Sequence, residues 1–154
     1  MNDFTLEQIQ EIVHKLERSQ LSGANLGSAK LRQVDLSEAK MDPVYLIRAD
    51  LTGANLQNAN LQNAVMHEAN LTEANMRKTY LINTRLNGSN LRNADLSGAV
   101  MDSADLTRAD LRGANLQNAN LQNTDLANAK YDGDTKWPQN FDPETAGAIF
   151  LIHE

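Results

Sequence analysis

The chain has 154 residues, a formal net charge of −6 at pH 7 and no cysteine. A chain of this length makes one domain, and without thiols it forms no disulfide. No apolar run is long enough to span a membrane, and the first residues lack the basic and then apolar pattern of a signal peptide, so we expect a cytoplasmic protein.

Residues 1–20 are expected to form a capping helix. Thr5 and Gln8 have the spacing of a capping box, and apolar side chains follow at helical spacing. These apolar residues are Leu6, Ile9, Val13 and Leu16. The pattern predicts a helix over roughly residues 5–18 that covers one end of the molecule. A helix lying on a membrane surface is the alternative, but its polar face holds few basic residues.

Residues 21–131 share a period of five. Every fifth residue from Leu21 to Tyr131 is large and apolar, and the residue two places earlier is most often alanine. The large apolar residue is called position i below. An α-helix would spread this period over its whole surface, and a long strand would alternate it between two faces. Short extended segments joined by corners instead give a coil, in which leucine and alanine point inward and each unit packs on its neighbours.

The units resemble the A(N/D)LXX repeat of the pentapeptide repeat proteins, over roughly residues 19 to 133. Examples are ANLQN at 54–58, ADLSG at 94–98 and ADLRG at 109–113. The resemblance implies an all-β solenoid, a right-handed quadrilateral β-helix with four units and twenty residues per coil. The string GANLQNANLQN at 53–63 recurs at 113–123, an offset of three such coils. At about 4.8 Å per coil, about six coils over residues 21–133 make a rod of roughly 27 Å.

Residues 134–154 form a closing tail of different composition. The tail resembles the last segment of cyanobacterial pentapeptide repeat proteins. Trp137 and Phe141 are suited to covering the leucines of the last coil, because a solenoid must cover its ends. The end of the tail, residues 149–152, is apolar. It either packs on the rod or mediates self-association.

No residue pattern points to catalysis, a metal or a cofactor. His14, His67 and His153 lie in three different regions without metal-ligand spacing. The run 132–134 (DGD) lacks the other carboxylates of a calcium loop. We therefore expect a non-enzymatic protein–protein interaction or scaffold module. An enzyme would need a convergent acid, base and nucleophile.

The charge distribution bears on an alternative function. Some members of the family resemble DNA in shape and charge and act on type II topoisomerases such as gyrase. A DNA mimic needs a dense field of one sign along the rod. Residues 21–130, however, carry eleven acidic and eleven basic side chains. A DNA-mimic regulator of gyrase is thus kept as the alternative to a scaffold. The same neutrality gives no basic groove, so direct nucleic-acid binding is not expected.

Some outward positions hold apolar side chains where the repeat otherwise has polar ones. With twenty residues per coil, these positions fall on two adjoining faces at the middle of the rod. The candidate partner-binding residues, called the apolar patch below, are Tyr45, Ile47, Val65, His67, Tyr80, Ile82 and Val100. A contiguous apolar patch indicates a binding site. Drift within a tolerant repeat and cover by the tail are the alternatives.

Overall fold

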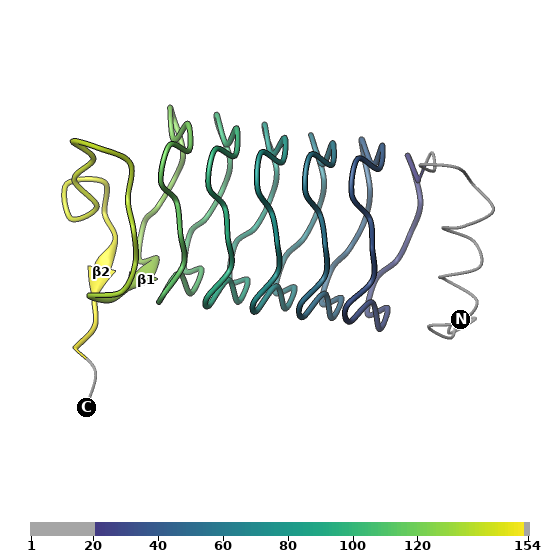
Figure 1. Cartoon of the computed structure of the whole chain (residues 1–154), viewed down its shortest axis with the longest axis horizontal. Helices are drawn as coiled ribbons and strands as arrows, with labels where there is room; N and C mark the ends of the chain where they lie inside the picture. The colour runs from purple at the N-terminus through teal and green to yellow at the C-terminus, as the bar shows by residue number, and fades with distance from the viewer. Residues whose placement is uncertain (1–20, 153–154) are drawn as a thin grey trace.

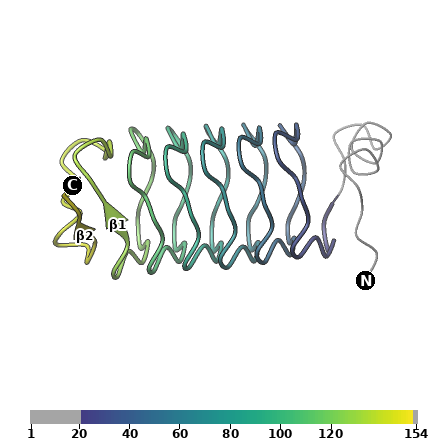
Figure 2. The ribbon, with the colours of Figure 1, turned by 90° about the horizontal axis from the view of Figure 1, so that it is seen from below.

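The computed structural model describes residues 21–152, which form a rod of stacked coils (Figure 1). Figure 2 shows the same coils from below, spaced along one axis with the tail at one end. Two short strands are present in the described part, β1 (Lys130–Tyr131) and β2 (Ile149–Phe150). Elsewhere in residues 21–152 the coils are joined by single-residue bridges. The capping helix predicted at 5–18 lies outside the described residues.

Four parallel ladders run along the rod and define its four sides. Between residues 25 and 130 each bridge pairs a residue at i−1 with the residue twenty places further along, as Tyr45 pairs with Val65, and the last bridge, Asn115 with Lys136, spans twenty-one. The predicted coil length is therefore confirmed, and the chain passes sides 1, 2, 3 and 4 in turn before it returns to side 1. Side 1 holds Asn25, Tyr45, Val65, Arg85, Asp105 and Asp125. Side 2 holds Lys30, Asp50, Asn70, Asn90, Asp110 and Lys130. Side 3 holds Asp35, Asn55, Asn75, Asp95, Asn115 and Lys136. Side 4 holds Lys40, Asn60, Tyr80, Val100 and Asn120.

The interior of the rod is filled from two positions of each unit. The leucines and methionines at i and the alanines at i−2 are buried from Leu31 to Leu116, as the period predicts. Two threonines replace alanine in the middle of the core. Thr79 Oγ1 donates to the Leu56 carbonyl at 2.9 Å, and Thr84 Oγ1 donates to the Leu61 carbonyl at 2.8 Å. Both buried hydroxyls are thus satisfied by the preceding coil.

The corners are stabilised by the Asn or Asp side chain at i−1. Its Oδ1 accepts the main-chain N–H of residue i+1, as Asn55 does from Gln57 at 3.2 Å. This contact is an Asx turn, a local alternative to regular secondary structure. Residue i+2 then takes a left-handed φ, as Asn58 does at 58°. Pro43 occupies an i+2 position after a cis peptide bond to Asp42.

The tail packs on the end of the rod. The Trp137 ring stacks on Phe141 with centroids 5.2 Å apart and meets Tyr131 edge-on at 5.5 Å. Trp137 and Phe141 both pack against the core cluster, as expected for residues that cover the last coil. Strand β2 pairs with β1 in parallel and so extends the ladder of side 2. This path leaves the apolar patch on sides 1 and 4 uncovered by the described tail.

Candidate partner-binding surface

The ladders bring four members of the apolar patch together in two pairs. Tyr45 lies beside Val65 on side 1, and Tyr80 lies beside Val100 on side 4. The two tyrosine side chains are 43% and 46% exposed, whereas both valines are half-buried. Side 4 leads directly into side 1, so the pairs lie on either side of one corner. A partner that contacts both pairs has to reach around this convex corner.

The other three members of the patch lie at corners. Ile82 follows Tyr80 at the corner between sides 4 and 1, whereas Ile47 and His67 lie at the far edge of side 1. Ile47 is 39% exposed, and Ile82 and His67 are half-buried. His67 Nδ1 is in hydrogen-bond contact with Asn87 Oδ1 in the next coil. The patch is therefore a band across side 1 and part of side 4.

An ion pair borders the patch next to Ile47 and His67. Arg48 Nε lies 2.7 Å from Glu68 Oε2. The hydrogen bond and charge of Arg48 hold the pKa of Glu68 below its usual value. Both side chains are exposed, so the pair is a polar rim and contributes little to stability.

The tyrosines and valines of the patch replace the residues that form Asx turns. At Tyr45, Val65, Tyr80 and Val100 the side chain has no carbonyl or carboxylate oxygen to accept the N–H of residue i+1. A typical intramolecular hydrogen bond contributes about 0.5–1.5 kcal/mol. These four corners therefore lack the local hydrogen bond that Asn or Asp provides at i−1.

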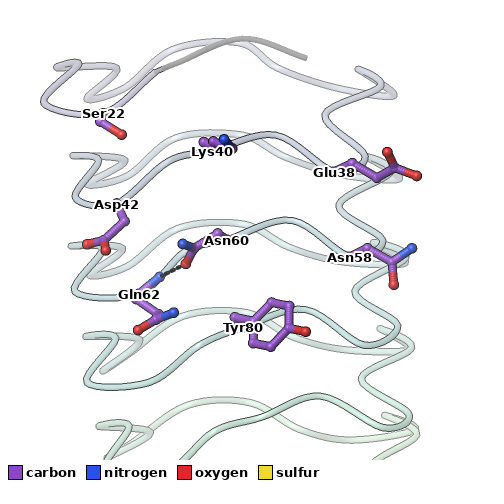
Figure 3. Close-up of a pocket in the computed structure, with 8 residues that line it drawn as sticks. All are labelled: Ser22, Glu38, Lys40, Asp42, Asn58, Asn60, Gln62 and Tyr80. Atoms are coloured by element: carbon purple, nitrogen blue, oxygen red, sulfur yellow. Dashed lines mark hydrogen bonds between the residues drawn. The ribbon is translucent and has the colours of Figure 1, made fainter.

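A groove on side 4 was not predicted from the sequence. It has a volume of about 440 Å³ and ends at Tyr80 (Figure 3). Its lining consists of Ser22, Glu38, Lys40, Asp42, Asn58, Asn60, Gln62 and Tyr80. The lining is mostly polar, so the groove adds hydrogen-bonding groups to the apolar patch and shares Tyr80 with it.

Basic residues around Tyr80 were also missed. Arg77 and Lys78 precede Tyr80, and Arg85 follows it on side 1. All three side chains are exposed. The sequence carries a signal for them, because residues 77–85 contain three basic side chains and no acidic one. Averaging charge over the whole rod hides this local excess.

Two further features are absent from residues 21–152. No three or more His, Asp or Glu side chains of this part converge where they could hold a metal ion. In the same range, no helix is long and apolar enough to cross a membrane.

A repeating five-residue unit wound into a four-sided coil defines a class of solenoid proteins. A family model described as pentapeptide repeats matches residues 19–56, 49–88, 75–113 and 104–130, with 8 copies. The chain belongs to the pentapeptide repeat family. This family forms right-handed quadrilateral β-helices, in agreement with the four ladders.

Solved structures of cyanobacterial pentapeptide repeat proteins are similar to this chain. One from Nostoc PCC 7120 is 31% identical, with 98% of this chain and 100% of that chain covered and a TM-score of 0.43. Rfr23 from Cyanothece 51142 is 32% identical, with 85% and 99% covered and a TM-score of 0.44. HetL from Nostoc PCC 7120, involved in heterocyst differentiation regulation, is 28% identical, with 76% and 67% covered and a TM-score of 0.37. No curated protein matches the sequence.

Proposed function

We propose that this protein is a non-enzymatic scaffold that binds a partner protein through the apolar patch. The observation that carries the proposal is the exposure of Tyr45 and Tyr80 at i−1 positions, where Asn or Asp would stabilise the corner. Aromatic side chains are common binding anchors, because they offer a large contact area with few rotatable bonds. In the proposed molecule, residues 1–20 cap a rod of about six coils, and the rod holds the patch rigid in the cytoplasm.

Capture of partners from the native cell extract tests this proposal. If the tyrosines are anchors, Tyr45→Ala and Tyr80→Ala should each weaken partner binding by more than about 1 kcal/mol. They should barely change the melting temperature, because neither side chain is in the core. Arg92→Ala, on the opposite corner of the rod, is the matched control. A double tyrosine variant that captures the same partners as the unchanged protein would refute the proposal.

A DNA-mimic regulator of gyrase is the alternative function. Its requirement is a continuous field of negative charge along the rod. Residues 21–130 have as many basic as acidic side chains, which favours the scaffold. A gyrase supercoiling assay separates the two functions. Inhibition that is lost when surface carboxylates are neutralised would favour the DNA mimic.

Self-association through the tail is a second part of the proposal. Ile149, Phe150 and Ile152 are exposed, and β2 is the last strand of the side 2 ladder in the described part of the chain. An edge strand with apolar side chains readily pairs with another strand. A second copy of the chain can supply that strand without covering the patch.

A further inference from the structure

We infer that the surface around Tyr80 binds an acidic, extended segment of the partner protein. The inference rests on the proposed function, because it names the chemistry of the partner at the same patch. Three features support it. Basic side chains without ion-pair partners surround Tyr80, apolar groups lie between them, and a groove leads away from Tyr80 along side 4.

The basic side chains are Arg77, Lys78 and Arg85. None of them forms an ion pair within residues 21–152, although other arginines in that range do. The ion pairs found there are Arg32 with Asp50, Arg48 with Glu68 and Arg112 with Asp110. Asp105 follows Arg85 in the side 1 ladder, and its Oδ1 accepts the N–H of Thr107 at 3.0 Å. Asp102 lies in the same next coil, where its main-chain carbonyl accepts the N–H of Asn83 at 3.1 Å. The three cations outnumber these two carboxylates, and a surface with an excess of positive charge favours a partner that supplies carboxylates.

These cations lie on both sides of an apolar strip. Arg77 and Lys78 belong to the corner before Tyr80, whereas Arg85 comes after the corner that contains Ile82. Lys78 lies over Gly98, since a Cβ on that glycine would be 3.4 Å from Lys78 Cγ. The partner segment should therefore place an apolar side chain against Tyr80 and Ile82, with carboxylates before and after it.

The groove favours an extended segment. It runs along side 4 from Lys40 past Asn60 to Tyr80 (Figure 3). Asn60 Oδ1 accepts the N–H of Gln62 at 3.1 Å, which leaves the amide N–H groups of Asn60 to donate to a peptide carbonyl. An extended chain that follows Lys40, Asn60 and Tyr80 along side 4 passes this amide group.

A protein segment fits this surface better than a nucleic acid does. Nucleic-acid affinity depends on several phosphate contacts along a continuous basic face. Here the groove itself contains Glu38 and Asp42, and Tyr80 and Ile82 require an apolar complement. A segment that carries carboxylates only where it passes Arg77, Lys78 and Arg85, and uncharged residues in the groove, satisfies both demands.

Selection of a random peptide library displayed on phage against the immobilised full chain tests the inference. We expect the recovered sequences to be enriched in Asp and Glu around an apolar residue. A synthetic consensus peptide should bind more weakly as NaCl rises from about 0.05 M to about 0.5 M. The triple variant Arg77→Ala, Lys78→Ala, Arg85→Ala should bind it about tenfold more weakly. Arg92→Ala, an exposed cation on the opposite corner, should bind it like the unchanged protein.

Several results would overturn the inference. They are recovery of no peptides, recovery of peptides without acidic enrichment, equal binding of the consensus peptide by the triple variant, and tighter binding of a short DNA duplex than of the peptide. All three substitutions are at exposed positions, so circular dichroism should show an unchanged fold. A different result would refute the proposed function, namely unchanged partner capture by Tyr45→Ala and Tyr80→Ala.

Discussion

The position of a residue in its five-residue unit decides how strongly its substitution changes the stability of the protein. Leu71 occupies position i and is fully buried, whereas Gln117 at i+1 is exposed. Leu71→Ala should lower the free energy of unfolding by about 2–5 kcal/mol, because it leaves a cavity in a stack that cannot collapse around it. Gln117→Ala should change it by less than about 0.5 kcal/mol. Urea denaturation measures both, and equal small losses would contradict the inward assignment.

Asp35 gives the corners a pH dependence. Hydrogen bonds from the hydroxyl and main-chain N–H of Ser37 lower the pKa of Asp35 below its usual value. A carboxyl with a lowered pKa in the folded state stabilises the protein above its unfolded pKa of about 3.9, and this stabilisation is lost as the pH falls through the folded value. The melting temperature should therefore drop below about pH 4.

Asp35→Asn is the matched variant for this pH effect. Asparagine can form the same Asx turn but does not titrate, so the melting temperature of the variant should fall less steeply below about pH 4. If the melting temperatures of the two proteins fall equally across this pH range, the Asp35 corner does not contribute to the pH dependence of stability.

At this scale the sequence predicts the regular positions well and the exceptions poorly. Leucine at i and alanine at i−2 could be assigned inward, because a period of five allows one inward arrangement. The hydroxyls of Thr79 and Thr84 are buried and donate to carbonyls of residues 56 and 61. The acceptors at residues 56 and 61 lie in another coil, so local sequence gives no direct signal for them, although Thr79 Oγ1 also lies 2.7 Å from the Met76 carbonyl in its own coil.

The tail is the element whose contribution can be followed by its own fluorophore. Trp137 is the single tryptophan of the chain, and it stacks on half-buried Phe141. Phe141→Ala should cost about half of the ~3–5 kcal/mol lost when a fully buried phenylalanine is truncated. It should also shift Trp137 emission to longer wavelength, because water reaches the indole. Gln139→Ala, exposed in the same tail, is the control, and unchanged emission in Phe141→Ala would contradict this packing.

The end of β2 can be tested for self-association. Phe150 is 47% exposed and Ile152 is 83% exposed. If two copies meet at this edge, Phe150→Ser with Ile152→Ser should shift the protein toward monomer in analytical ultracentrifugation, since the apolar contact area is lost. The equivalent change at Tyr45 and Tyr80 should leave the oligomeric state unchanged. A protein that is monomeric before any substitution would show that the tail does not associate.

Neither the path of the tail nor the groove on side 4 could be predicted from the sequence. Residues 134–152 have no period, so the pairing of Lys130 with Ile149 depends on how Trp137 and Phe141 pack at the rod end. The groove depends on side-chain length at stacked positions such as Lys40, Asn60 and Tyr80. The five-residue period predicts which way these side chains point, but it does not predict how far they extend.

At the scale of the whole molecule, the apolar patch depends on the angle about the rod axis between side 1, which carries Tyr45, and side 4, which carries Tyr80. Deletion of residues 71–75 removes one unit and keeps every leucine inward, so we expect the variant to fold. It moves Tyr80 from side 4 to side 3, whereas Tyr45 and Val65 stay on side 1. A partner that needs both tyrosines should then bind as weakly as it does to Tyr80→Ala.

Deletion of residues 106–110 is the control for this prediction. It also removes one unit, but it lies beyond Val100 and leaves the patch in place, so partner capture should be retained. Circular dichroism should show the same β signal for both variants. If the variant without residues 71–75 still captures the partner, or the variant without residues 106–110 does not, partner binding does not depend on the angle between the sides that carry Tyr45 and Tyr80.

The twenty-residue register also bears on how such a chain can change in length. Between residues 25 and 130, the side of an i−1 residue follows from its number. Division of that number by twenty leaves a remainder of five on side 1, ten on side 2, fifteen on side 3 and none on side 4. Duplication of twenty residues therefore lengthens the rod and keeps every later surface in line with the earlier ones. Duplication of five residues rotates every later surface by a quarter turn, so length variants of this chain fall into four rotational classes.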